Sequence, residues 1–288
     1  MRNSDVTISK KQLRAAIIGS GNIGMDILMK LKKSSSVCCS WLIGRNPMSE
    51  NLQLAKAQGV NTTAEGIKAL ESLKDEYDIV FDATSANDHI EHAILLKRLG
   101  KQVIDLTPAK IGEMCVPVIN LDKVINKDNI NMVTCGGQAA IPICYALSKV
   151  FERIPYIEVV SSISSKSAGP ATRANLDEYI LTTERAITVF SGACKAKAIL
   201  NINPATPEVT MKTTIFAYVE NPDVSVVKKE VIKMITRVQN YMPHYQLVLE
   251  PYFDGSKLSI ILEVTGAGDY LPEFAGNYNT PRNLNSIF

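Results

Sequence analysis

The sequence predicts an α/β protein with a nucleotide-binding parallel sheet first and a second, α+β unit after it. Three observations support this prediction. A glycine-rich turn follows the first apolar run, strand and helix patterns alternate as far as residue 134, and a Cys-Gly-Gly tripeptide begins at Cys135. Strands that alternate with helical segments are typical of parallel sheets. We place the first domain at 1–134, leave open whether 277–288 return to it, and expect 135–276 to form an antiparallel sheet with covering helices.

The first apolar run and the turn after it have the pattern of a Rossmann-type dinucleotide site. The run begins at Leu13 and ends in G-x-G-x-x-G, and the stretch 25–31 after it is amphipathic. In this fingerprint the glycines make a tight turn, let the backbone approach a pyrophosphate, and let the helix pack on the strand, while the helix N-terminus faces the anion. A glycine-rich turn without a ligand is the alternative. The expected nucleotide contacts are Gly19, Ser20, Gly21, Asn22, Ile23 and Gly24.

The end of the second predicted strand, 37–43, bears on which dinucleotide binds. NAD sites often carry an acidic residue about 20 positions after the glycine motif, where it bonds the adenosine ribose. Here the strand is followed by Gly44, Arg45 and Asn46, without a carboxylate. The planar guanidinium of Arg45 suits a 2′-phosphate, and a solvated arginine in a turn is the alternative. The sequence therefore leaves NAD and NADP open.

Two small polar residues follow the next strands of the predicted parallel sheet. Ligands of such sheets lie beyond the carboxyl ends of the strands. We therefore expect Ser85 and Thr107 beside the nucleotide. The strands are predicted over 77–84, 101–106 and 130–134, and a helix over 89–99.

A thiol occupies the last of these strand-to-helix turns. Cys135 follows the strand and precedes a helix expected over 139–150. A helix N-terminus carries about half a positive charge, so it favours a thiolate and can depress the pKa of a cysteine from about 8.5 toward neutrality. Its N–H groups can also stabilise an oxyanion, and we expect Gly136 and Gly137 to keep the approach open. Cys135 is the expected nucleophile, with Gly136, Gly137 and Gln138 as catalytic neighbours; a buried cysteine that caps a helix is the alternative.

The other cysteines and the histidines give no metal pattern, and we assign no metal. No Cys-x-x-Cys pair combines with a second pair or a histidine cluster, as a zinc site would require. His89 and His92 share one helix face, and we expect a solvated or capping role for them. We expect small buried hydrophobes at Cys38, Cys39, Cys115, Cys144 and Cys194.

Composition excludes several classes of protein. The chain has 288 residues, of which 46% are hydrophobic and 21% charged, as is typical of a folded protein with two domains. The net charge of +2 and the absence of a basic stripe predict no nucleic-acid partner. The apolar stretches are shorter than the roughly 20 residues that span a bilayer, and the first residues are polar. We therefore expect a cytoplasmic protein without a membrane partner.

Five segments carry a resemblance to a known family: Gly19–Gly24, Asp78–Ala86, Ile104–Ala109, Asn131–Ala139 and Ser165–Pro170. With them the chain resembles the acylating acetaldehyde dehydrogenases. These enzymes work beside 4-hydroxy-2-oxovalerate aldolase in the breakdown of aromatic compounds. The similarity runs from about Arg14 to Asn277, and the cysteine and Ser-Lys-Ser-Ala-Gly-Pro segments are its most specific parts.

The resemblance implies a Rossmann-type domain joined to an α+β catalytic and dimerisation domain of the glyceraldehyde-3-phosphate and aspartate-semialdehyde dehydrogenase type. It implies that Cys135 attacks a short-chain aldehyde, that the thiohemiacetal passes a hydride to NAD or NADP, and that coenzyme A captures the resulting thioester; the reverse reaction uses the same groups. It further implies a homodimer and an aldolase partner. The additional nucleotide contacts that it implies are Ser167, Ala168, Gly169, Pro170 and Asn277.

Two departures from the family leave alternatives open. Where the family has Met-Arg-Asp-Thr, with an aspartate that assists the cysteine, this chain has Thr213 in place of the aspartate. The chain is also shorter than the family between Tyr245 and Ser259 and lacks its helical tail after 277, so the aldolase partner is left open. The alternatives are a biosynthetic acyl-CoA reductase with a different acyl group and a catalytically inactive, nucleotide-binding regulatory paralogue.

Overall fold

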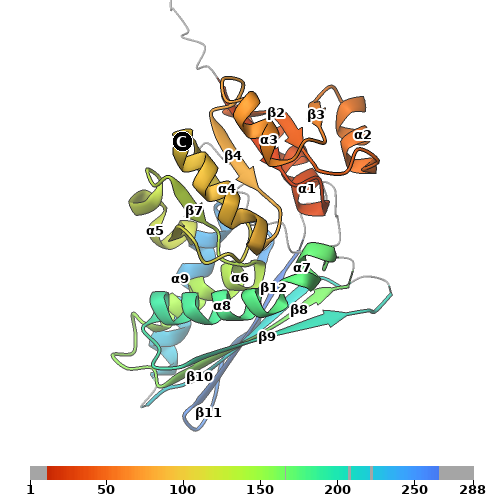
Figure 1. Ribbon diagram of the computed structural model, residues 1–288. Helices are drawn as coiled ribbons and strands as arrows, with labels where there is room; N and C mark the ends of the chain where they lie inside the picture. The colour runs from red at the N-terminus through yellow and green to blue at the C-terminus, as the bar shows by residue number, and fades with distance from the viewer. Residues whose placement is uncertain (1–11, 166, 207–208, 221–222, 266–288) are drawn as a thin grey trace, which may run out of the picture.

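The computed structural model describes residues 12–165, 167–206, 209–220 and 223–265. Within them the chain forms two sheets with helices around and between them (Figure 1). No helix of this part of the chain is long and apolar enough to cross a membrane. The segment 277–288 and its Asn277 lie outside the described residues.

The first sheet has seven strands, and all its pairings are parallel. Its first five strands have the order of a Rossmann-type domain, which confirms the predicted fold class. In spatial order the strands are β3 (Asn61–Thr63), β2 (Val37–Ile43), β1 (Leu13–Ile18), β4 (Ile79–Asp82), β5 (Gln102–Asp105), β7 (Asn129–Asn131) and β6 (Glu113–Met114). The helices of this part are α1 (Asn22–Leu31), α2 (Glu50–Ala57), α3 (Ile67–Ser72), α4 (Ala86–Arg98) and α5 (Pro117–Val124).

The second sheet has five strands and is mixed, whereas an antiparallel sheet was expected. Strands β8 and β9 run parallel, because the segment between them contains a crossover helix that returns the chain to the same end of the sheet. In spatial order the strands are β11 (Tyr245–Asp254), β12 (Lys257–Val264), β10 (Met211–Tyr218), β8 (Tyr156–Ser164) and β9 (Ala196–Asn203). The remaining helices are α6 (Cys135–Leu147), α7 (Pro170–Ala174), α8 (Leu176–Ser191) and α9 (Val224–Gln239).

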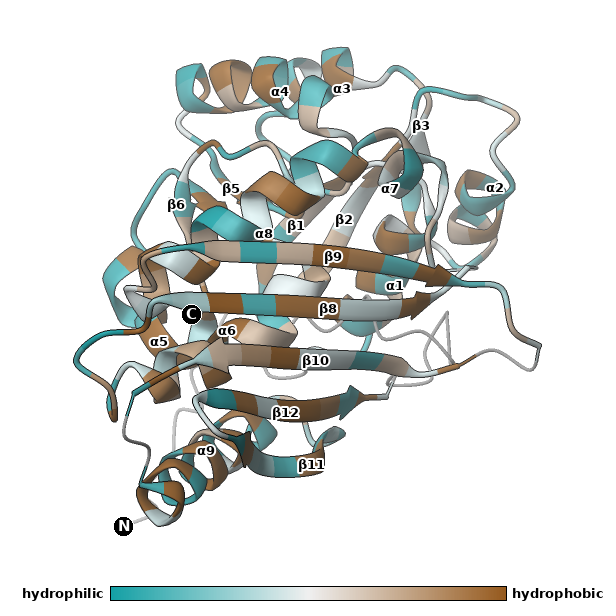
Figure 2. Cartoon of the chain, turned by 90° about the horizontal axis from the view of Figure 1, so that it is seen from below, coloured by the Kyte–Doolittle hydropathy of each residue, from teal (hydrophilic) through white to brown (hydrophobic). Residues whose placement is uncertain are grey.

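Helix α6 lies at the centre of the molecule. Figure 2 looks onto the second sheet, with α6 and α8 behind its strands. Every residue of α6 from Gly136 to Cys144 is buried, and the helix shares one apolar core with the inward side chains of β8 and β10, such as Ile157 and Ile215. A helix that is apolar all round requires burial on every side. The thiol at its start is therefore fixed by the packing of the whole second unit.

The start of α6 differs from the prediction. Strand β7 ends at Asn131, although it was expected to continue to 134, and the helix begins at Cys135 instead of 139. The three residues between form a short loop in which Val133 adopts a left-handed backbone with φ of 61°. Since β-branched residues rarely take this conformation, hydrogen bonds must hold the loop.

The expectation of buried cysteines holds for two of the five. Cys115 and Cys144 are buried, while Cys38 and Cys39 are half-buried. Cys194 is exposed, because the chain leaves α8 through the left-handed Gly192 and passes over the surface before β9 begins. Its expected burial is wrong.

Candidate active site

The glycine loop after β1 combines one tight turn with one open position. Gly19 has φ of +110°, and a Cβ there would lie 2.5 Å from the carbonyl oxygen of Ala83 in the loop after β4. A Cβ on Gly24 would overlap the carbonyl of Gly19, whereas a Cβ on Gly21 would meet no atom of the described residues within 4 Å. Helix α1 begins here without a side-chain cap from the described residues. This open cradle fits the pyrophosphate of a dinucleotide.

Arg45 reaches across the same edge of the sheet. Its guanidinium is 82% exposed and lies 3.5 Å from the carboxylate of Asp88 in the first turn of α4. Ser85 caps that helix, since its hydroxyl accepts from the backbone N–H of Asp88 and donates to the Asp88 carboxylate at 2.7 Å. Among the described residues the Arg45 head group is thus held by this exposed ion pair alone.

His89 and His92 belong to a buried cluster of charged groups with Asp82 and Asp105, which was not expected. His89 and His92 are 0% and 6% exposed, and the Nδ1 of each lies 2.8 Å from the Asp82 carboxylate. The Nε2 of His89 also faces Asp105, at 3.3 Å. Helix α4 begins at Ala86 after its N-cap Ser85, and both rings turn inward toward Asp82. A solvated role is therefore wrong.

The placement of His89 between two carboxylates determines the charges of this cluster. Burial acts to lower the pKa of His89, but the Asp82 and Asp105 carboxylates outweigh it and raise this pKa. Burial acts to raise the pKa of Asp82, but bonds from both histidines hold it well below its usual range. Burial raises the pKa of Asp105 to about 6, against the opposing effect of His89.

Asp105 connects this cluster to the cysteine loop. The amide of Asn131 donates to the Asp105 carboxylate at 2.7 Å and to the carbonyl of Thr107 at 3.0 Å. The Asn131 oxygen accepts from the backbone N–H of Val133 at 3.0 Å. These bonds hold Val133 in its left-handed conformation and so set where α6 begins. The Thr107 hydroxyl is buried and has no partner among the described residues.

Cys135 is the first residue of α6 and is half-buried. Its Sγ lies 3.5 Å from the hydroxyl of Tyr179 in α8, and the same hydroxyl accepts the backbone N–H of Gly136 at 2.9 Å. Burial raises the pKa of the Cys135 thiol, against the opposing effect of Tyr179 and of the N–H groups of Gly136 and Cys135. The expected lowering of this pKa by the helix N-terminus is therefore wrong.

The glycines after the cysteine serve close packing, not the open approach that was expected. A Cβ on Gly136 would overlap the Tyr179 hydroxyl and lie 2.6 Å from the Ser161 hydroxyl. A Cβ on Gly137 would lie 2.9 Å from the Thr134 hydroxyl, which caps α6 by accepting the Gly137 N–H. Because the N–H groups of Gly136 and Gly137 are already bonded, their expected role toward an oxyanion is not supported by this arrangement.

Gln138 holds the loop and does not bond the thiol. Its buried amide donates to the carbonyls of Cys115 and Met132, at 2.6 and 2.8 Å. These bonds connect the first turn of α6 to the loop before it. The geometry gives Gln138 a positioning role.

The segment after β8 returns to the nucleotide edge. Gly169 is the N-cap of α7 and Pro170 is its first residue. The carbonyl of Ala168 accepts from Arg173 at 2.9 Å, and Asn175 accepts the backbone N–H of Ala86 at the start of α4 at 3.1 Å. The segment is thereby tied to the first sheet. The Ser167 hydroxyl, like that of Thr107, is buried and without a partner in the described part of the chain.

Sequence reasoning missed Tyr179, Ser161 and Asn175. Ser161 is buried on β8, and its hydroxyl lies 3.3 Å from that of Thr213, the position where the family carries an aspartate. Tyr179 and Asn175 lie about 40 residues after the cysteine, in a stretch that has only the pattern of an amphipathic helix. No motif marks these residues, since they act through tertiary contacts.

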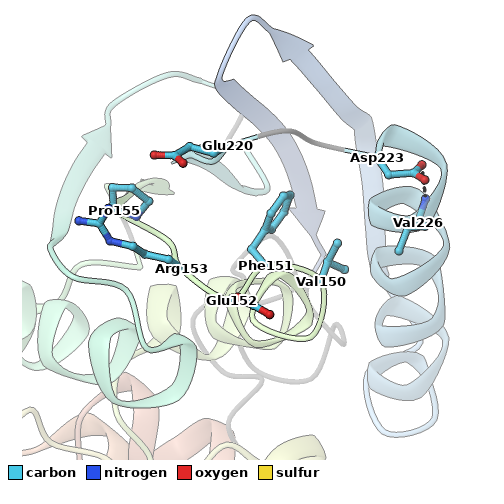
Figure 3. A pocket seen from close by; sticks show the side chains of 8 residues that line it. All are labelled: Val150, Phe151, Glu152, Arg153, Pro155, Glu220, Asp223 and Val226. Carbon is cyan, nitrogen blue, oxygen red and sulfur yellow. Dashed lines mark hydrogen bonds between the residues drawn. The ribbon is translucent and has the colours of Figure 1, made fainter.

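A cavity of about 390 Å³ lies away from this site (Figure 3). It is formed by the segment 150–155 after α6 and by the start of α9, and its lining includes Arg153, Glu220 and Asp223. None of the predicted site residues lines it. The candidate active site is therefore the edge of the first sheet together with the start of α6.

The fold and this site define a Rossmann-type oxidoreductase with a thiol at the edge of its nucleotide-binding sheet, and comparisons with known proteins agree. Residues 135–272 match the family described as prokaryotic acetaldehyde dehydrogenase, dimerisation. An acetaldehyde dehydrogenase of Spirochaeta aurantia is 48% identical over 270 residues, which cover 94% of this chain and 91% of that protein. One of Burkholderia pseudomallei strain 668 is 50% identical over 264 residues, covering 92% and 89%, and one of Geobacillus stearothermophilus is 47% identical over 268 residues, covering 92% and 91%. The chain belongs to the acetaldehyde dehydrogenase family.

Proposed function

We propose that this protein is an acylating aldehyde dehydrogenase that interconverts a short-chain aldehyde, coenzyme A and NAD(P)⁺ with acyl-CoA and NAD(P)H. The observation that carries the proposal is the shared edge of the first sheet. The glycine loop follows the carboxyl end of β1, and Cys135 follows that of β7, in one parallel sheet. A nucleotide bound at the glycine loop would therefore lie at the same edge of the sheet as the thiol. The relatives named acetaldehyde dehydrogenase support acetaldehyde as the substrate.

Two unpaired hydroxyls support the nucleotide site. Thr107 follows β5 of the first sheet, and Ser167 follows β8 of the second. Both hydroxyls are buried without a partner among the described residues. Buried polar groups are ordinarily hydrogen-bonded, so both suit a polar ligand. The glycine loop, Arg45, Ser85, Thr107 and the segment 167–170 would hold NAD or NADP, whose nicotinamide accepts or returns a hydride.

Cys135 carries the covalent steps of this proposal. Its thiolate attacks the aldehyde carbon and forms a thiohemiacetal. Loss of a hydride leaves an acyl thioester on Sγ, and transfer of the acyl group to the thiol of coenzyme A restores the free thiolate. The buried contacts of Gly136 and Gln138 keep Sγ in place through these steps. The division of the chain at residues 134 and 135 and the role of Asn277 remain predictions.

One observation keeps a second candidate, the catalytically inactive regulatory paralogue. Thr213 is fully buried and pairs with Ser161, so no carboxylate from β10 assists the thiol. Such a paralogue would bind the nucleotide and form no thioester. An enzyme re-tasked for another acyl group would form one selectively.

Intact-protein mass spectrometry tests these candidates. Wild type and Cys135→Ala are mixed with a panel of acyl-CoAs, and NADH or NADPH is then added to discharge the adduct as aldehyde. An adduct on wild type alone, discharged by one nucleotide, supports the proposal and identifies the acyl group. Nucleotide binding without any adduct would favour the regulatory paralogue.

We also propose a homodimer formed through the face of the second sheet on which the described residues place no helix (Figure 2). The family model that matches 135–272 describes dimerisation. On this face Val160, Thr214 and Ile261 form a cross-strand row from β8, β10 and β12 and are only half-buried. Light scattering on wild type and Val160→Lys tests this, since a charge in a dimer core should yield monomers. The aldolase partner remains an untested prediction.

A further inference from the structure

We propose that Tyr179 is a catalytic residue whose hydroxyl donates a hydrogen bond to the Cys135 thiolate. The inference rests on the proposed function, because it takes Cys135 as the nucleophile. It concerns a residue that neither the sequence motifs nor the comparisons single out.

The direction of the hydrogen bonds around Tyr179 supports this role. A backbone N–H can only donate, so the Tyr179 oxygen is the acceptor in its 2.9 Å contact with Gly136. The hydroxyl proton is then available for another acceptor. The Cys135 sulfur lies 3.5 Å away, within hydrogen-bond range for sulfur. A bond of this kind favours the charged form of the acceptor, so it favours the thiolate over the thiol.

The structure holds the Tyr179 ring in this position. The ring is buried, and the Thr183 hydroxyl donates to the Tyr179 carbonyl at 2.7 Å. Since the Thr183 proton is used there, Thr134 is the donor in its 2.8 Å contact with Thr183. Thr134 is also the N-cap of α6. One set of bonds therefore connects the tyrosine to the helix that begins at Cys135.

The side of the site formed by β8 and β10 is filled by neutral groups. Thr213 bonds Ser161, and Ser161 packs directly against Gly136. The elements around the thiol thus present hydroxyls: Thr134 before α6, Tyr179 from α8, Ser161 from β8 and Thr213 from β10. Within the described residues no charged side chain bonds the sulfur. Burial also keeps the pKa of Tyr179 well above its usual value, so the phenol remains a donor at neutral pH.

The test compares Tyr179→Phe with Tyr245→Phe. Tyr245 is another buried tyrosine, and its hydroxyl donates to the carbonyl of Ala139 in α6, away from the thiol. Each change removes one hydroxyl that hydrogen-bonds the backbone of α6, at nearly constant side-chain volume. The measurement is the rate at which iodoacetamide alkylates Cys135 between about pH 6 and pH 10, followed on the tryptic peptide by mass spectrometry. The exposed Cys194 of the same sample is the internal reference.

We expect Tyr179→Phe to shift the alkylation profile of Cys135 to higher pH and to slow alkylation at about pH 7 by about tenfold, since a hydrogen bond to a charged group is of this size. Alkylation of Cys194 should be unchanged, and Tyr245→Phe should match wild type at both cysteines. A Cys135 profile in Tyr179→Phe that coincides with wild type would overturn the inference. Thermal melting of each variant shows whether it is folded.

Turnover separates this inference from the proposed function. In the acylating reaction Tyr179→Phe should lower kcat and leave the KM for aldehyde nearly unchanged, since the phenol contacts the sulfur. If wild type forms no acyl adduct, the proposed function fails, yet the alkylation profiles still decide whether Tyr179 acts on the thiol. If wild type forms the adduct and the profiles coincide, only the role of Tyr179 fails.

Discussion

The glycine loop at 19–24 and the cysteine turn at 135–137 share a local design, in which a strand leads through glycines into a helix at one edge of one sheet; the first has three glycines and the second has two. In the first, Gly21 faces open space and α1 has no side-chain cap within the described residues. In the second, neighbouring atoms occupy the space that a Cβ would need at Gly136 and at Gly137. The N–H groups of these two glycines bond Tyr179 and Thr134. The first turn leaves room at Gly21, whereas the second is closely packed. The groups around Gly137 come from the adjacent Val133 and Thr134. Those around Gly136 come from Ser161 and Tyr179, farther along the chain.

The largest effect is expected at the second turn, from Cys135→Ala. Removal of the nucleophile should reduce turnover by at least about 10³-fold, because the covalent route is lost. Nucleotide affinity, which depends on the first turn, should change little. Steady-state kinetics and fluorescence titration with NADH and NADPH measure the two properties. Retained turnover would remove the proposed mechanism.

A matched pair of glycine substitutions separates the two turns further. Gly136→Ala places a methyl group against Tyr179 and Ser161, so it should lower the free energy of unfolding by about 2 kcal/mol, as overpacking does. Gly21→Ala projects into open space and should cost less than about 1 kcal/mol.

Nucleotide binding should respond in the opposite order. Gly21→Ala obstructs the approach of the pyrophosphate and should weaken binding about tenfold. Urea unfolding and nucleotide titration of both variants give the comparison. Equal effects of the two substitutions on both properties would contradict the distinction between the turns.

The first turn was predictable from sequence because its geometry is local. The tight turn at Gly19, the open position at Gly21 and the close packing at Gly24 all follow from residues within one motif. The second turn was only partly predictable. Its cysteine and Thr134 are adjacent in sequence, but Tyr179 arrives from α8 and its contacts depend on the fold.

The errors have related physical causes. The expected drop in the pKa of Cys135 considered the helix N-terminus alone, whereas burial of the thiol outweighs the opposing hydrogen bonds. His89 and His92 were expected to be solvated because they are polar, whereas the fold pairs both rings with the buried Asp82 carboxylate of β4. Local motifs thus fix positions along the chain, and tertiary burial decides the charge state at those positions.

The charge cluster below the edge predicts how stability depends on pH. Burial raises the pKa of Asp105 to about 6 in the folded protein, above its unfolded value, so the folded state binds more protons there at mildly acidic pH. The contribution of Asp105 to stability is therefore present below about pH 4 and is lost as the pH rises through about 6. His89, whose folded pKa is also raised, loses its contribution as the pH rises through its folded value.

Asp105→Asn should therefore flatten the decline of stability between about pH 4 and pH 7, by on the order of 2 kcal/mol. Urea unfolding of wild type and Asp105→Asn across this range measures the difference. Asp78→Asn is the control, because Arg14 lowers the pKa of that surface carboxyl to about 2 and its contribution is lost only in stronger acid. Parallel curves for wild type and Asp105→Asn would show that Asp105 is not the titrating group.

The smallest expected effect concerns Arg45, at the border of the first turn. Its guanidinium is 82% exposed and its contact with Asp88 is 3.5 Å long, so the ion pair contributes little to stability and the head group is available for a 2′-phosphate. Arg45→Ala should weaken NADP binding about tenfold relative to NAD binding if the two share this cradle. Arg98→Ala, which removes an exposed arginine paired with Glu71 at the other end of α4, is the matched control and should change neither affinity. Isothermal titration with both nucleotides measures the ratio. An unchanged ratio of NADP to NAD affinity in Arg45→Ala would mean that Arg45 is a solvated turn residue. The glycine loop would then be the remaining candidate for phosphate binding at this edge of the sheet.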